Sequence, residues 1–167
     1  IKNFGENRVQ DGINRWSKIK SEKITLSFVG PLQTNKSEDV INQFHEVQSL
    51  DRLKLVKSLS KAESKLKKRL NYMIQVNTGS EVQKSGINPN ETDDFIKLCK
   101  KDYGLNVTGI MCIPPINQNS AIHFAFMSEI YKRNNLQYLS MGMSNDYKIA
   151  LDHGSTMVRI GSYLYHS

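Results

Sequence analysis

The chain has 167 residues, of which 38% are hydrophobic, 23% are charged and 8% are aromatic. This length and mixture suit one globular domain with a single core, and they exclude a disordered or collagen-like chain. The net charge of +7 favours an anionic partner, which could be nucleic acid, a membrane surface or a phosphorylated small molecule.

No apolar run approaches the ~18 residues that a membrane span needs, and the first ten residues lack the apolar stretch of a signal peptide. The two cysteines, Cys99 and Cys112, are too far apart for a Cys-x-x-Cys motif and too few for a disulfide framework. We therefore expect a reduced, cytoplasmic setting.

Short apolar runs rich in β-branched residues alternate along the chain with amphipathic helical patterns. The helical pattern is found at residues 6–19, 36–44, 52–66, 90–103, 121–134 and 147–151. The strand pattern is found at residues 24–29, 45–50, 72–76, 107–113, 138–141 and 157–160. Residues 1–4 resemble the end of one more strand. Gly154 is predicted to stop the last helix.

Alternation of strands and helices with short connections predicts a parallel sheet, either doubly wound or closed as a barrel. Eight strand–helix units need about 250 residues, which is more than this chain has. We therefore predict a (β/α)8 TIM-type barrel that lacks its first strand or strands, with residues 1–167 forming a single, incomplete α/β barrel domain. We also expect the natural protein to have an upstream segment, and the shortened chain to dimerise or swap strands.

In parallel sheets and barrels the working residues follow the carboxyl ends of the strands. These positions hold the segments FGEN, GPLQTNK, SLDR, VNTGSEVQKSG, IPP, MGMSND and RIGS. They offer backbone N–H groups and hydroxyls rather than acids, bases or metal ligands. The four histidines have no zinc-site spacing, and no nucleophile elbow, P-loop or dinucleotide-binding glycine motif occurs.

The last two strand ends are the most informative. In MGMS, Gly142 permits a tight turn and the Ser144 hydroxyl can meet an anion. In RIGS, Gly161 lets the backbone approach a ligand, and Ser162 adds a hydroxyl and an N–H. The loops after the final two strands of a barrel commonly seat a phosphate. The alternative is that each Gly-Ser pair is an ordinary turn.

Several other residues have two interpretations. Arg159 lies inside an apolar strand, where it is either half of a buried ion pair or a donor aimed into the barrel mouth. The segment 154–156 (GST) precedes its strand, so it belongs to the opposite, stabilising end of the barrel. Cys99 lies on the apolar stripe of a helix and is predicted to be core, whereas Cys112 could face the mouth.

The strand-end segments, in this order, closely resemble those of the pyridoxal phosphate homeostasis family, also called proline synthase co-transcribed proteins. The matching segments are FGENRVQ, FVGPLQTNK, SLDR, VNTGSEVQKSG, GIMCIPP, LSMGMSND and GSTMVRIG. The resemblance implies a barrel similar to the N-terminal domain of alanine racemase. It also implies a protein that binds pyridoxal 5′-phosphate (PLP), acts in PLP homeostasis, is a monomer when complete and is not an enzyme.

Carried over by position, the resemblance implies that Ser144, Gly161 and Ser162 hold the cofactor phosphate. Arg159 would face the pyridine nitrogen and Asn7 would lie beside the ring. Because arginine is always protonated, it favours an unprotonated ring nitrogen, which makes the ring a poorer electron sink. Holding or handing over the cofactor is then favoured over carbanion chemistry.

The sequence also departs from the family. The Schiff-base lysine of the family lies on its first strand, which is not in this sequence, and neither Lys36 nor Lys84 matches the lysine motif. Ser27 replaces a common His, Asn145 a common Asp, and His166 a usual Gly.

Two alternative functions stay open. The first is a fold-type III PLP-dependent amino-acid racemase or decarboxylase. Those enzymes usually add a C-terminal β-domain, and here only Tyr163, Tyr165 and His166 could supply a second acid or base. The second is a binder of nucleic acid or an anionic surface, which would use the lysines of the basic segment 61–70.

Overall fold

Each apolar, β-branched run of the sequence forms a strand, and the strands line up in one sheet. The computed structural model describes residues 1–19, 23–79 and 85–161. Neighbouring strands are parallel throughout and follow the order of the chain. The strands within these residues are β1 (Asn3–Glu6), β2 (Thr25–Phe28), β3 (Glu46–Leu50), β4 (Asn71–Val76), β5 (Asn106–Cys112), β6 (Tyr138–Met143) and β7 (Met157–Arg159).

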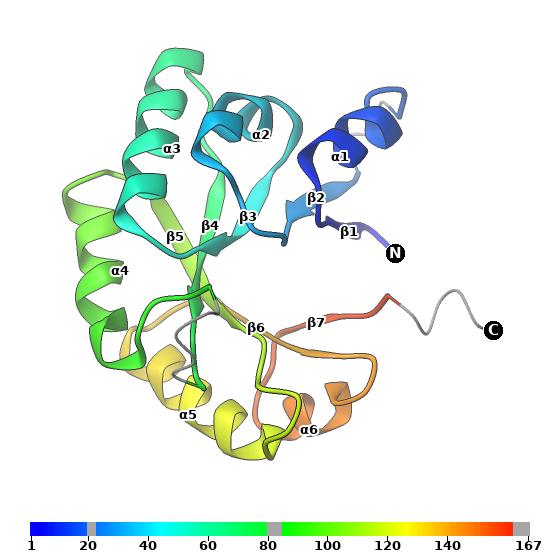
Figure 1. Ribbon diagram of the computed structural model, residues 1–167, viewed down its shortest axis with the longest axis vertical. Helices are drawn as coiled ribbons and strands as arrows, with labels where there is room; N and C mark the ends of the chain where they lie inside the picture. The colour runs from blue at the N-terminus through cyan, green and yellow to red at the C-terminus, as the bar shows by residue number, and fades with distance from the viewer. Residues whose placement is uncertain (20–22, 80–84, 162–167) are drawn as a thin grey trace.

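The amphipathic patterns form the helices that connect these strands. They are α1 (Val9–Trp16), α2 (Ser37–Gln43), α3 (Leu53–Leu66), α4 (Thr92–Lys101), α5 (Ser120–Arg133) and α6 (Tyr147–Asp152), with the 3-10 turns η1 (Thr34–Lys36) and η2 (Pro89–Glu91) before α2 and α4. The helices surround the curled sheet, and its outer strands β1 and β7 lie on the same side of the molecule (Figure 1). This arrangement confirms the predicted barrel class. Among the described helices, none has the length and apolarity to cross a bilayer.

The predicted elements are all present, and their ends differ by a few residues. Helix α1 begins at Val9 rather than at residue 6, because Glu6 belongs to β1. The buried Glu6 carboxylate accepts hydrogen bonds of 2.7 Å from both Arg15 and Trp16. Strand β6 continues to Met143, past the predicted end at 141, and Gly142 within it has a φ of +93°, where the pairing register with β7 shifts.

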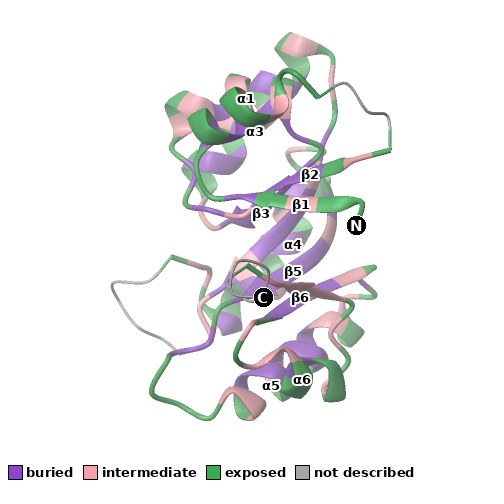
Figure 2. Ribbon diagram, turned by 90° about the vertical axis from the view of Figure 1, so that its right-hand side faces the viewer, coloured by how far each residue is buried: buried purple, intermediate pink, exposed green. Residues whose placement is uncertain are grey.

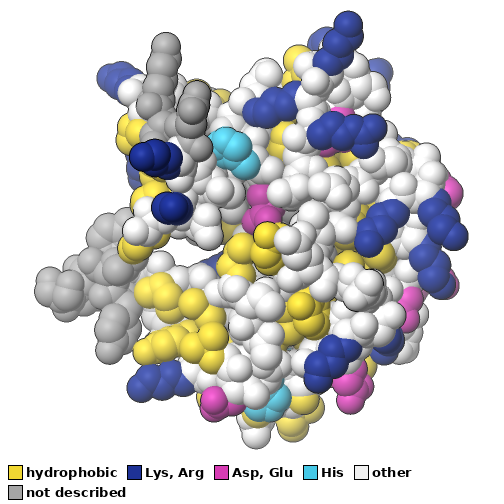
Figure 3. Space-filling view, turned by 180° about the vertical axis from the view of Figure 1, so that it is seen from behind, with side chains coloured by type: hydrophobic (Ala, Val, Ile, Leu, Met, Phe, Trp, Pro, Cys, Tyr) yellow, Lys and Arg dark blue, Asp and Glu magenta, His cyan; other side chains and the backbone are white. Residues whose placement is uncertain are grey.

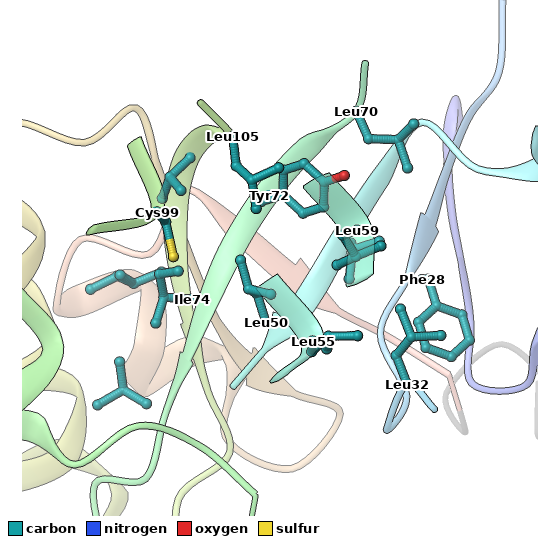
Figure 4. Close-up of a cluster of buried hydrophobic side chains, with 14 of the residues drawn as sticks. Phe28, Leu32, Leu50, Leu55, Leu59, Leu70, Tyr72, Ile74, Cys99 and Leu105 are labelled. Carbon is teal, nitrogen blue, oxygen red and sulfur yellow. The ribbon is translucent and has the colours of Figure 1, made fainter. Parts of the chain in front are cut away.

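The hydrophobic core lies between the outer face of the sheet and the helices. Figure 4 shows Tyr72 of β4 near Leu59 of α3, and Ile74 of β4 near Cys99 of α4. The residues coloured as buried in Figure 2 follow the strands and the adjoining helix faces. Cys99 of α4 is fully buried in this cluster, which confirms that it is a core residue.

The end of α6 confirms that Gly154 stops this helix. Gly154 has a φ of +84° and donates its N–H to the Leu151 carbonyl, while Ser155 donates to the Ala150 carbonyl, both at 2.9 Å. These two bonds form a Schellman motif. The Thr156 hydroxyl accepts from the Leu139 N–H at 2.7 Å. The segment 154–156 is therefore structural and lies at the amino end of β7.

The basic segment 61–70 runs from α3 into β4, at the amino ends of the strands. Lys65 pairs with Glu38 at 2.8 Å, and Lys68 donates to the Asn42 carbonyl at 2.9 Å. On the face shown in Figure 3, lysine and arginine side chains stand in separate groups. Part of the predicted basic surface is therefore engaged in contacts within the protein.

Candidate functional site

A cavity of about 730 Å³ opens at the carboxyl ends of the strands and extends into the barrel. Four of the strand-end segments line it: FGEN at the end of β1, IPP after β5, MGMSND at the end of β6 and RIGS at the end of β7. GPLQTNK, SLDR and the described part of VNTGSEVQKSG do not contribute to its described wall. The first and last strands of the described chain therefore share one cavity.

Ser144 and Gly161 line this cavity from the ends of β6 and β7. A Cβ atom added at Gly161 would meet no atom of the described residues within 4 Å, so the backbone here borders open space in that part of the chain. A ligand could therefore approach the main chain at Gly161 closely. Ser162, which was predicted to act with these two residues, lies outside the described residues.

The turn that carries Ser144 is fixed by its neighbours. A Cβ at Gly142 would come within 2.6 Å of the Ala150 Cβ, so helix α6 packs directly against this glycine. Asp146 then closes the turn, because its Oδ1 accepts from the Met143 N–H at 2.7 Å and its own N–H donates to the Met143 carbonyl at 3.0 Å. Ser144 is thus held between two constrained positions.

Arg159 reaches the cavity from β7, and hydrogen bonds within the protein hold its guanidinium in place. One Nη donates to the Ser140 hydroxyl at 2.6 Å, and the other donates to the Cys112 carbonyl at 2.8 Å. Burial lowers the pKa of the guanidinium, while the Asp146 carboxylate acts in the opposite direction. Within residues 1–19, 23–79 and 85–161, Arg159 forms no ion pair, so the buried ion pair that the sequence also allowed is not formed among these residues.

Asn7 is exposed and lines the cavity just after β1. Its backbone touches the turn after β2 so closely that a Cβ at Gly30 would lie 2.0 Å from the Asn7 carbonyl oxygen. Only glycine fits at position 30, and this close contact fixes the place of Asn7. The structure thus brings Asn7, Ser144, Arg159 and Gly161 to one cavity.

The sequence analysis missed a group of polar side chains inside the barrel. Gln48 and Ser27 line the inner part of the cavity, and both are linked by hydrogen bonds to the buried Glu46. Ser140 of β6, fully buried, connects this group to Arg159. A sequence signal existed, since strands of a parallel sheet are normally apolar on both faces and β3 instead alternates Glu, Val and Gln.

The prediction that Cys112 could face the barrel mouth is wrong. Cys112 is fully buried in the hydrophobic core, and burial raises the pKa of its thiol to about 12, although Arg159 acts in the opposite direction. The two lysines that do not match the family motif also add nothing to the described wall. Lys36 pairs with Asp39 at 3.2 Å, and Lys84 lies outside the described residues.

The described wall of the cavity carries few ionisable side chains. Its only ionisable side chains in the described ranges are Arg159 and Asp146, and one oxygen of Asp146 is engaged by the Met143 N–H. The apolar wall comes from Phe4 and the segment Ile113, Pro114 and Pro115. A small molecule with an apolar ring, a hydrogen-bond acceptor and an anionic group would find complementary surface here.

Comparison with known proteins agrees with this description. A family described as "Alanine racemase, N-terminal domain" matches residues 1–167. The chain is 37% identical to the pyridoxal phosphate homeostasis protein of Pasteurella multocida over 174 residues, covering 97% of this chain and 75% of the relative. The corresponding protein of Pseudomonas aeruginosa is 35% identical, with 99% and 74% covered.

PipY of Synechococcus elongatus is a similar solved structure. Without PLP it matches with a TM-score of 0.88 at 27% identity, over 99% of this chain and 82% of that one. PipY with PLP bound matches with a TM-score of 0.86 at 26% identity, over the same shares. The chain therefore belongs to the pyridoxal phosphate homeostasis protein family and carries the alanine racemase N-terminal domain.

Proposed function

We propose that this protein binds PLP in the cavity at the carboxyl ends of its strands and acts in PLP homeostasis without catalytic turnover. The family relatives bear that name, and the similar protein PipY has been solved with PLP bound. The proposal places the protein in the cytoplasm, with PLP as its partner and neither nucleic acid nor a membrane as a ligand.

The residues that line the cavity support an assignment for each part of the cofactor. The Ser144 hydroxyl and the open backbone at Gly161, together with Ser162, would hold the phosphate. Arg159 would donate to the pyridine nitrogen, and Asn7 would lie beside the ring. The observation that carries the proposal is Arg159, a cavity-lining guanidinium fixed by Ser140 and Cys112 with no ion pair among the described residues.

These contacts favour holding the cofactor over transforming a substrate with it. PLP, when bound, supplies an aldehyde and an electron-withdrawing ring, and the ring withdraws most strongly when its nitrogen is protonated. Arg159 can only donate a hydrogen bond, so it supports the unprotonated nitrogen. The described wall also lacks a free acid–base pair, since Asp146 is engaged in the turn after β6.

Equilibrium dialysis of the full chain against PLP tests the proposal directly. We expect saturable binding that Arg159→Met weakens about 10- to 100-fold, the range for losing a hydrogen bond from a charged donor. Arg133→Met is the matched control, because Arg133 pairs with Asp93 on the surface and should leave binding unchanged. An absence of saturable binding would overturn the proposal. Production of D-amino acids by the PLP-loaded protein would overturn its non-catalytic part.

A further inference from the structure

A continuous chain of hydrogen bonds crosses the inside of the barrel from Arg159 to a buried carboxylate. Arg159 of β7 donates to the Ser140 hydroxyl at 2.6 Å, and Ser140 of β6 donates to Gln48 Oε1 at 2.7 Å. Gln48 of β3 then donates through Nε2 to Glu46 Oε1 at 2.7 Å. Ser27 of β2 donates to the same Glu46 oxygen at 2.9 Å. Four strands are joined in this way.

The two ends of this chain determine the direction of every bond within it. A guanidinium can only donate and an ionised carboxylate can only accept. Ser140 therefore accepts from Arg159 and turns its own proton to Gln48, whose amide oxygen must face Ser140. The Gln48 NH₂ group then faces Glu46, so one arrangement satisfies all the links. No other orientation of the Ser140 hydroxyl and the Gln48 amide satisfies all of these hydrogen bonds.

The members of the chain are deeply buried, so each depends on the others. The exposed fractions are 0% for Ser140, 1% for Gln48 and 4% for Glu46. A buried carboxylate or hydroxyl without a partner is destabilising, and Glu46 forms no ion pair with any described residue. Burial also raises the pKa of Glu46, an effect that Gln48 and Ser27 oppose.

We propose that Glu46, Gln48 and Ser140 are positioning residues that orient the Arg159 guanidinium toward the pyridine nitrogen of bound PLP. This inference rests on the function proposed above and extends it to residues that do not line the phosphate end of the cavity. Ser140 fixes one Nη directly, and Gln48 and Glu46 keep the Ser140 hydroxyl oriented as an acceptor for Arg159. Losing any link frees the guanidinium to rotate away from the ring.

The test compares PLP with its deaza analogue, in which a C–H replaces the ring nitrogen. Wild-type protein should bind PLP about 10-fold more tightly than the analogue, because only PLP accepts from Arg159. Ser140→Ala and Gln48→Leu should reduce this ratio to about 2-fold or less. Glu46→Gln, which retains an acceptor oxygen, should preserve the ratio, whereas Glu46→Leu should lose it.

Two controls separate orientation from general damage. Ser49→Ala removes a buried hydroxyl from the same strand as Gln48, and the Ser49 oxygen has no hydrogen-bond partner among the described residues. This variant should keep the wild-type ratio. Ser144→Ala should weaken PLP and its analogue equally, since both carry the phosphate. A variant that merely loosens the fold would likewise weaken both ligands and leave their ratio unchanged.

A ligand-free measurement keeps the test independent of PLP binding. In protein labelled with ¹⁵N-arginine, the two Nη groups of Arg159 should give separate NMR signals, because each is held by a different partner. Ser140→Ala should merge these signals, and Arg159→Lys identifies them by their loss. Merged signals in the wild type, equal wild-type binding of both ligands, or an unchanged ratio in Ser140→Ala would each overturn the inference. If PLP does not bind while the signals behave as expected, the proposed function fails and the hydrogen-bond chain stands.

Discussion

Gly142 lies within β6 and Gly161 follows the neighbouring strand β7, and the two glycines differ in the space around them. A Cβ at Gly142 would come within 2.6 Å of the Ala150 Cβ, whereas one at Gly161 would meet no described atom within 4 Å. Gly142 also has a φ of +93°, which L side chains rarely adopt. The first glycine is therefore required by the fold, and the second is free to serve a ligand.

Substitution of these two glycines should separate stability from binding. Gly142→Ala should lower the free energy of unfolding by about 2–4 kcal/mol, since it adds backbone strain to a steric clash. Gly161→Val should leave that free energy within about 0.5 kcal/mol of the wild type and yet weaken PLP binding, because its side chain would project into open space beside the cavity. Urea unfolding and equilibrium dialysis measure the two effects. A Gly142→Ala variant that is as stable as the wild type would contradict the expected destabilisation.

The role proposed for Ser144 predicts selective loss of affinity for the phosphate. Ser144→Ala should weaken PLP binding by about 5- to 10-fold, the effect of one hydrogen bond to an anion. Binding of unphosphorylated pyridoxal, measured by the same dialysis, should not change. Ser64→Ala on the exposed side of α3 is the control, since that hydroxyl bonds only the Ser60 carbonyl of its own helix. Equal losses for both ligands would exclude a phosphate contact.

The buried Glu46 predicts how stability depends on pH. Burial raises the pKa of this carboxyl above its ordinary value of 4.5 in the folded protein. The folded state therefore holds the proton more tightly than the unfolded state. Its stabilising contribution is complete below pH 4.5 and is lost as the pH rises through the folded-state pKa.

Comparison with Glu46→Gln isolates this contribution from all other titrating groups. The free energy of unfolding of the wild type, relative to that of the variant, should fall as the pH is raised from about 4 to 8. Urea unfolding across that range provides the measurement. A difference that stays constant, or that rises with pH, would show that burial is not the main influence on the pKa of Glu46.

Both cysteines should resist thiol reagents in the native protein. Cys99 and Cys112 are fully buried, and burial raises the pKa of each thiol to about 12. The reactive thiolate is therefore scarce as well as inaccessible near neutral pH. A colorimetric disulfide reagent should react with neither thiol until denaturant is added, and then with both. Rapid labelling of one cysteine in the native state would show that its part of the core opens.

The order and type of the elements could be predicted from the sequence because the apolar periodicity changes at each element. The strand at 45–50 has a less apolar sequence than a parallel strand normally has, and the structure gives the reason. Val47 faces the hydrophobic core, while Glu46 and Gln48 point to the polar interior of the barrel. Polar residues in that alternation are typical of an exposed face, and only the closure of the sheet buries them.

The candidate site could be predicted in part by the rule that ligands bind at the carboxyl ends of parallel strands. That rule led to Ser144, Arg159 and Gly161, and the family resemblance added Asn7; all four line the cavity. The rule could not show which strand ends line the cavity, because the direction in which each loop turns depends on contacts such as that between Gly30 and Asn7. It also missed Gln48 and Ser140, whose partners lie far away in the sequence.

The cavity wall is assembled from β1, β2, β3 and β7 and from the loops after β5 and β6, so no continuous stretch of the chain contains it. The cavity forms only when the whole sheet has assembled, so a molecule that occupies it binds the folded chain and not the unfolded one. By mass action, a ligand present at 100 times its dissociation constant would add about 2.7 kcal/mol to the folding equilibrium. The supply of ligand in the cell would thereby set how long each copy of this protein escapes proteolysis.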